Sequence, residues 1–173
     1  MLSQGDVSAT IYTLIGICIT AWALTMAYGL LFPERTEIAR LEISTRPLTC
    51  IGRGAAIFLT AGLFGAILVG AGHNPLVKLF GWTILMALFL VAALGLAGIA
   101  MSAGERLRRL APEMNAYAAF ARGAAFLTLG CVLPLVGWFA FGPLLFIAAI
   151  GAGSKAAFSR ARQIAEVSQA EAA

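Results

Sequence analysis

Four long apolar blocks, separated by short polar stretches, run along this chain. They cover about residues 9–32, 54–72, 79–102 and 123–153. An α-helix rises 1.5 Å per residue, so about 20 apolar residues cross a hydrocarbon layer roughly 30 Å thick. Lipid offers no partner to backbone polar groups, which favours helices. The pattern predicts an all-α, polytopic transmembrane helical bundle, one membrane domain over residues 1–173 with a polar tail at 154–173.

The first block is expected to stay in the protein. The residues before it contain Asp6 and no Lys or Arg, and its apolar run is longer than that of a cleaved signal peptide.

The fourth block is too long for one upright crossing. Its roughly 31 residues would reach about 46 Å as a straight helix. It contains Pro134 and then Gly142-Pro143, and proline inside a helix removes a hydrogen bond and bends or ends it. We expect this block to be broken or re-entrant, with a tilted single crossing as the open alternative.

The positive charges indicate the orientation. Eight Lys and Arg side chains lie in the first and third connections, three lie in the tail and only Lys78 lies in the second connection. A fourth block that turns back gives a split of 11 against 1, whereas a single crossing gives 8 against 4. Because cytoplasmic loops are enriched in basic residues, we expect an external N-terminus, cytoplasmic first and third connections and a cytoplasmic tail.

Composition agrees with a membrane protein. The chain is 61% hydrophobic and 12% charged, with a mean hydropathy of +0.92, which excludes a water-soluble fold. The net charge of +4 needs no nucleic-acid partner, because the orientation rule explains it. The preference for Arg over Lys, with abundant Ala and Gly, is typical of a high-GC bacterium and points to a bacterial inner membrane. The first connection, Pro33 to Pro47, places Ile38 and Leu41 among charged residues, an amphipathic pattern suited to the membrane surface.

None of the four blocks contains Asp, Glu, Lys, Arg or His. Pumps and ion-coupled transporters need such groups at membrane depth. No phosphate-binding glycine loop, metal-ligand spacing or pair of carboxylates is present in the sequence either. The sequence therefore predicts no enzyme, no catalytic residue, no cofactor and no metal site.

For the histidine, the cysteines and the aromatic residues, the sequence favours structural roles. His73 is the sole histidine, so an exposed turn is favoured over a ligand or a pH sensor. The three cysteines form no Cys-x-x-Cys pair, and lipidation is an alternative for one of them, Cys50. Aromatic residues near block ends favour interfacial anchoring over a quinone or pigment contact: Tyr12, Tyr28, Trp82 and Trp138. The other two cysteines, inside apolar blocks, are Cys18 and Cys131.

Small residues recur at helix-face spacing in three blocks. Helices in lipid associate by close packing, so such stripes indicate helix contacts, either within this chain or with an oligomer or partner. The stripes are Thr13, Gly16, Thr20, Ala23 and Ala27; Gly62, Ala66 and Gly70; and Ala93, Ala97 and Ala100.

Two stretches resemble a known membrane domain, the one often found C-terminal to bactofilin-like, polymer-forming cytoskeletal modules of bacteria. They are Leu31-Phe32-Pro33-Glu34-Arg35 leading to Arg46-Pro47-Leu48 and Gly52, and Leu133-Pro134-Leu135-Val136-Gly137-Trp138 with a glycine-rich end at Gly151 to Gly153. The resemblance implies a membrane anchor or scaffold. Because this chain carries no β-rich polymerising module, filament formation is not implied.

These observations lead to a ranked set of functions. The first is a non-enzymatic accessory or scaffold subunit that assembles with itself or with a larger membrane complex. The alternative is a passive small-solute channel built around the broken fourth block, since irregular backbone at membrane depth is tolerated where it lines a cavity. A third, weaker hypothesis is a membrane enzyme with lipid-like substrates.

Overall fold

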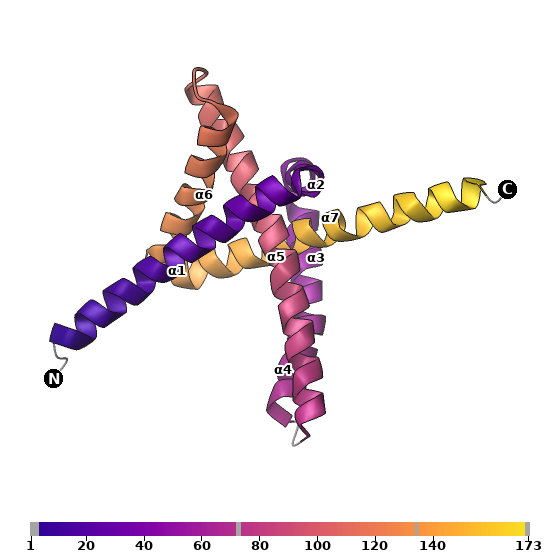
Figure 1. Ribbon diagram of the computed structural model, residues 1–173, viewed down its shortest axis with the longest axis horizontal. Helices are drawn as coiled ribbons and strands as arrows, with labels where there is room; N and C mark the ends of the chain where they lie inside the picture. Colours follow the sequence, from indigo (N-terminus) through magenta and orange to yellow (C-terminus); the bar gives the residue numbers. More distant parts are fainter. Residues whose placement is uncertain (1–3, 72–73, 134, 172–173) are drawn as a thin grey trace.

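The computed structural model describes residues 4–71, 74–133 and 135–171, and no strand occurs among them. Their arrangement is shown in Figure 1. The helices are α1 (Gln4–Leu31), α2 (Pro33–Thr45), α3 (Pro47–Ile57), a π-helical turn η1 (Phe58–Gly62), α4 (Leu63–Ala71), α5 (Pro75–Leu110), α6 (Ala116–Val132), a second π-helical turn η2 (Gly137–Phe141) and α7 (Gly142–Glu171).

Four helical stretches are long and apolar enough to cross a membrane, which confirms the predicted all-α, multi-pass bundle. They are Tyr12–Leu31, Pro47–Gly70, Pro75–Leu110 and Gly137–Ser159. The second and third membrane-spanning stretches begin earlier than the apolar pattern predicted, at Pro47 and Pro75. Proline suits the first helical position, because its fixed φ is already helical and its missing N–H needs no partner there. At the start of α5, the side chain of Asn74 also accepts a hydrogen bond from the Leu76 amide at 3.0 Å.

The fourth block is broken, as predicted. Helix α6 ends at Val132 and the next helical residue is Val136, directly before η2, so the interruption spans 133–135, where Pro134 lies outside the described residues. The α7 leg then runs across the molecule toward the C-terminus, away from α6 (Figure 1).

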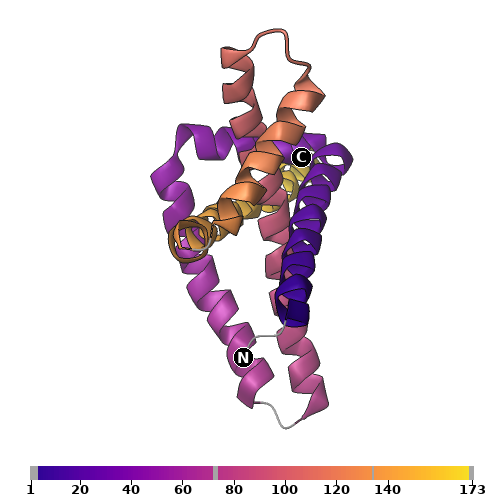
Figure 2. The same cartoon turned by 90° about the vertical axis from the view of Figure 1, so that its left-hand side faces the viewer.

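Helix α5 is the centre of the fold and contacts five other helices: α1, α2, α4, α6 and α7. The end of α4 and the start of α5 lie at one end of the molecule, and the α5–α6 hairpin forms the opposite end (Figure 2). Both views show α7 crossing α5 transversely at mid-length. This crossing divides α5 into a half that packs on α4 and a half that packs on α2 and α6.

Where the helices cross, glycines of one helix lie directly against the backbone of another helix. A Cβ atom on Gly153 of α7 would overlap the carbonyl oxygen of Val91 in α5. Where α3 crosses α7, a Cβ atom on Gly54 would likewise overlap the carbonyl oxygen of Ile147. In lipid there is little hydrophobic force between helices, so this close packing is the main source of cohesion.

Candidate functional site

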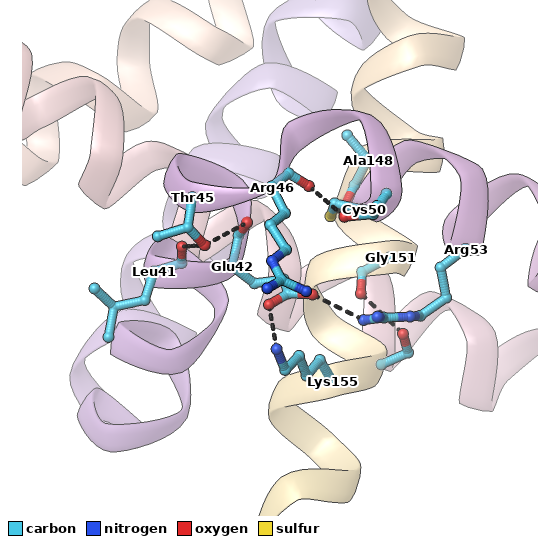
Figure 3. Close-up of polar contacts among 11 residues, drawn as sticks. Leu41, Glu42, Thr45, Arg46, Cys50, Arg53, Ala148, Gly151 and Lys155 are labelled. Carbon is cyan, nitrogen blue, oxygen red and sulfur yellow. Dashed lines mark hydrogen bonds and ion pairs between the residues drawn. The ribbon is translucent and has the colours of Figure 1, made fainter.

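Two cations from different helices pair with one buried carboxylate, that of Glu42 in α2. Its side chain is only 4% exposed. Arg53 of α3 donates from Nη1 to Oε1 of Glu42 at 3.0 Å, and Lys155 of α7 donates from Nζ to Oε2. The consecutive helices α2 and α3 and the distant helix α7 therefore meet on one side chain (Figure 3).

The protonation of Glu42 follows from this geometry. Burial by itself would raise the pKa of Glu42, but the hydrogen bonds from Lys155 and Arg53 outweigh it and hold the pKa below its ordinary value. The carboxylate is therefore ionised at neutral pH. A buried charge of this kind is tolerated only when it is paired, which makes the two cations structurally necessary.

The corner that follows Glu42 lies between α2 and α3, two helices that each begin with a proline. Pro33 and Pro47 begin α2 and α3, and Arg46 lies between the helices in a non-helical conformation. The chain thus turns at Arg46, and the last turns of α2 face the first turns of α3. Beside this corner Cys50 is fully buried, and its thiol donates to the Ala148 carbonyl oxygen of α7 at 3.4 Å.

Helix α2 turns small and polar side chains toward the bundle. Leu41 is 48% exposed, and Ile38 is half-buried at the edge of the core. The residues that face inward are Thr36, Ala39 and Glu42. Small side chains are needed there because α5 approaches closely: a Cβ atom on Gly98 would lie 2.6 Å from the Ala39 Cβ.

A second ion pair ties the same helix to α5. Arg40 donates to Glu37 within α2 and to Glu105 in the polar extension of α5. The hydrogen bond to Glu37 is the largest reason that the pKa of Arg40 is raised. Charged residues of the first connection, the third connection and the tail therefore contact one another, so these three segments lie on one side of the bundle.

An apolar cavity of about 220 Å³ lies between α1, α5, α6 and α7. Its polar lining groups have partners in their own helices: the hydroxyls of Thr25 and Thr128 donate to the carbonyls of Ala21 and Ala124 at 2.8 Å. A wall without free hydrogen-bonding groups suits an apolar occupant and offers nothing to a polar solute.

The residues after the interruption in the fourth block divide between an outward and an inward face. Trp138 and Phe139 in η2 are 59% and 80% exposed. Gly137 faces inward instead, with the carbonyl oxygens of Gly130 and Cys131 within 2.7 Å of where its Cβ would be. The backbone of η2 is thus packed against α6 at Gly137, while the side chains of Trp138 and Phe139 point outward from the protein.

The predicted aromatic anchors divide in the structure. Tyr12, Trp82 and Trp138 are exposed, which suits contact with lipid. Tyr28 is half-buried and packs on the ring of Phe32, with 6.0 Å between the ring centroids. Trp22, which the sequence did not single out, links helices by donating from Nε1 to the Ala121 carbonyl oxygen at 3.0 Å.

The three small-residue stripes have different surroundings. Ala93, Ala97 and Ala100 are buried inside the bundle. In the second stripe Gly62 packs near Leu88, whereas Gly70 has nothing within 4 Å of its Cβ position. The first stripe is the most open: its exposed members are Thr13, Gly16, Thr20 and Ala23.

The structure describes the three cysteines but not the sole histidine. Within the part of the chain that the structure describes, no group of three His, Cys, Asp or Glu residues is placed to hold a metal ion. His73 lies outside the described residues. Cys18, Cys50 and Cys131 are free thiols, and Cys50 is enclosed by α7.

Sequence reasoning missed Glu42, which it grouped with the solvated charges of the first connection. A signal was present, because Glu42 is spaced three residues from Ala39 and six from Thr36, on one helix face. The resemblance to the bactofilin-associated domain stays a prediction. Comparison with protein-family models, with curated proteins and with solved structures finds no match to this chain.

Proposed function

We propose that this chain is a non-enzymatic accessory or scaffold subunit of a bacterial inner membrane, and that it assembles with itself or with a larger complex through α1. The observation that carries the proposal is the exposure of the N-terminal half of this helix. Tyr12, Ile15 and Ile19 are 50% or more exposed. In Figure 1 this part of α1 extends away from the other helices.

The surface of that segment suits a second helix. A Cβ atom on Gly16 would meet nothing within 4 Å. Thr13 and Thr20 donate their hydroxyls to Ala9 and Gly16 at 2.8 Å, so a partner in lipid would not have to satisfy them. Small residues with internally bonded hydroxyls allow the close helix approach that drives association in membranes.

The orientation belongs to the same proposal. The first connection, third connection and tail face the cytoplasm, and the N-terminus lies outside. The contacts of Glu42 with Lys155 and of Arg40 with Glu105 support a shared side for these segments. In this orientation the α1 stripe runs through the membrane and the ionic cluster lies at the cytoplasmic boundary.

A passive channel for polar solutes receives less support. The cavity beside the fourth block is lined mainly by Ala, Leu and Phe, and the hydroxyls of Thr25 and Thr128 are bonded to their own helices. An apolar wall raises a barrier to ions and small polar molecules.

The test is purification of the full chain from native membranes in mild detergent, followed by mass measurement of the intact particle. We expect a stoichiometric assembly that Gly16→Leu disrupts, because the added side chain separates the helices. Gly70→Leu is the matched control, since Gly70 also has open space at its Cβ position but lies on α4. A monomer without partners, unchanged by Gly16→Leu, would rule the proposal out.

A further inference from the structure

The Glu42 cluster contains more positive charge than its carboxylate neutralises. Arg53 and Lys155 pair with Glu42, and the exposed Arg46 lies four residues after Glu42 at the corner before α3. In Figure 3 the side chain of Arg46 extends from that corner toward the Glu42 carboxylate. Three cations around one carboxylate leave an excess of two positive charges.

The neighbouring acidic groups are already engaged. Glu37 and Glu105 both accept hydrogen bonds from Arg40. Their two negative charges exceed the single charge of Arg40 by one, so the two groups together have an excess of one positive charge, which lies at Arg46, Arg53 and Lys155.

The paired cations also keep donors in reserve. Arg53 contacts Glu42 through Nη1, and a guanidinium has five N–H donors. Lys155 contacts the other carboxylate oxygen with one of its three N–H groups. Their side chains are 42% and 47% exposed, so the remaining donors are accessible. Buried Glu42 thus holds two cations in place without using all of their hydrogen-bond donors. This fixed placement lowers the entropic cost of binding an anion.

The position of the cluster suggests the source of that anion. Arg46 immediately precedes the apolar stretch Pro47–Gly70, and Lys155 lies in the last turns of the stretch that ends at Ser159. Because Lys155 is held by Glu42, about one helical turn before Arg46, the cluster lies at the start of the Pro47–Gly70 stretch, near the boundary between hydrocarbon and water. Two leucines beside the cluster face outward, Leu41 at 48% and Leu48 at 83% exposure. Cations next to exposed apolar side chains match a phospholipid, whose phosphate adjoins its acyl chains.

We propose that Arg46, Arg53 and Lys155 form a binding site for the phosphate of an anionic phospholipid, with Glu42 as the positioning residue. The inference is independent of any assembly through α1. Guanidinium groups suit this role because they bind phosphate oxygens in a bidentate manner, and Lys155 adds a point charge.

The test uses the full chain in uncharged detergent, titrated with short-chain phosphatidylglycerol and followed by native mass spectrometry. We expect phosphatidylglycerol to bind, and phosphatidylcholine and free glycerol phosphate to bind at least about tenfold more weakly, since the first lacks net charge and the second lacks acyl chains. Equal binding of phosphatidylcholine, or of glycerol phosphate, would overturn the assignment to an anionic lipid.

Variants test the residues. Arg46→Gln is expected to weaken phosphatidylglycerol binding about fivefold, in line with the usual contribution of one basic residue near an anionic surface. Arg109→Gln removes the same charge from the exposed end of α5 and should leave binding unchanged. Arg53→Lys keeps the positive charge beside Glu42 and removes the guanidinium, so it should preserve the melting temperature and weaken binding.

Two results would overturn the proposal. One is equal binding by the wild type, Arg46→Gln and Arg53→Lys proteins. The other is a loss of a co-purifying acidic protein in Arg46→Gln with lipid binding intact, which would assign the cations to a protein partner instead.

Discussion

Gly95 in α5 lies directly against the backbone of Ala149 in α7, so close that a Cβ atom on Gly95 would overlap the Ala149 carbonyl oxygen. Ala149 is fully buried at this point. The crossing of the two helices therefore depends on the absence of a single methyl group.

Gly95→Ala is expected to destabilise the fold by about 3 kcal/mol or more, because the backbone atoms that it meets cannot rotate away as a side chain can. Gly52→Ala is the control. Its Cβ position has nothing within 4 Å, so the better helix propensity of alanine should leave stability equal or raise it by up to about 1 kcal/mol. Thermal unfolding in detergent measures both changes. Equal melting temperatures for the two variants would contradict the backbone contact.

The ion pairs of Glu42 predict a dependence of stability on pH. Because the folded state lowers the pKa of Glu42, its contribution is complete above the unfolded glutamate pKa of about 4.3 and is lost as the pH falls through the lower folded pKa. Glu42→Gln should cost about 1 to 3 kcal/mol at pH 7 and much less in strong acid. Chemical unfolding of both proteins across pH 3 to 7 measures this difference.

The control for that experiment is Glu113→Gln, which changes an exposed residue in the turn between α5 and α6. It should shift neither the stability at pH 7 nor its acid dependence appreciably. A constant gap between the wild type and Glu42→Gln at every pH would argue against an ionised, paired Glu42.

The hydrogen bond from Trp22 to the Ala121 carbonyl attaches α1 to α6. Trp22→Phe keeps an aromatic ring and removes the donor, so we expect a loss of about 1 kcal/mol in stability. Trp138→Phe makes the same change at a side chain that is 59% exposed and should have little effect. Comparing the two melting temperatures tests the link, and a larger shift for Trp138→Phe would disprove it.

The proposed orientation predicts where reporters become active. A reporter fused after Ala173 should behave as cytoplasmic, and one inserted near Asn74 should behave as external. The physical reason is that Lys155 contacts Glu42, whereas the start of α5 lies at the far end of the bundle (Figure 2). If the tail reporter is active on the external side, the fourth block crosses the membrane once instead.

The hydrophobic pattern alone was sufficient to predict the class of the fold. Long uncharged blocks must become helices in lipid, where backbone groups have no other partners, and the structure confirms helices in all four. The break near Pro134 was also predictable, because proline interrupts the helix hydrogen bonds locally. Helix starts were less predictable, since Pro47 and Pro75 begin helices several residues before the uncharged blocks.

The tertiary structure decided which polar and small residues matter. In the sequence, only its helix-face spacing from Thr36 and Ala39 separates Glu42 from Glu37. In the structure Glu42 is buried between three helices, whereas Glu37 is paired with its neighbour Arg40. Likewise, all three stripes of small residues have similar spacing, but only the packing of α5 against its neighbours buries one of them completely. Burial and charge compensation arise from contacts between different helices. The sequence therefore determined the helices, whereas their crossings created the ionic cluster and left the N-terminal half of α1 exposed.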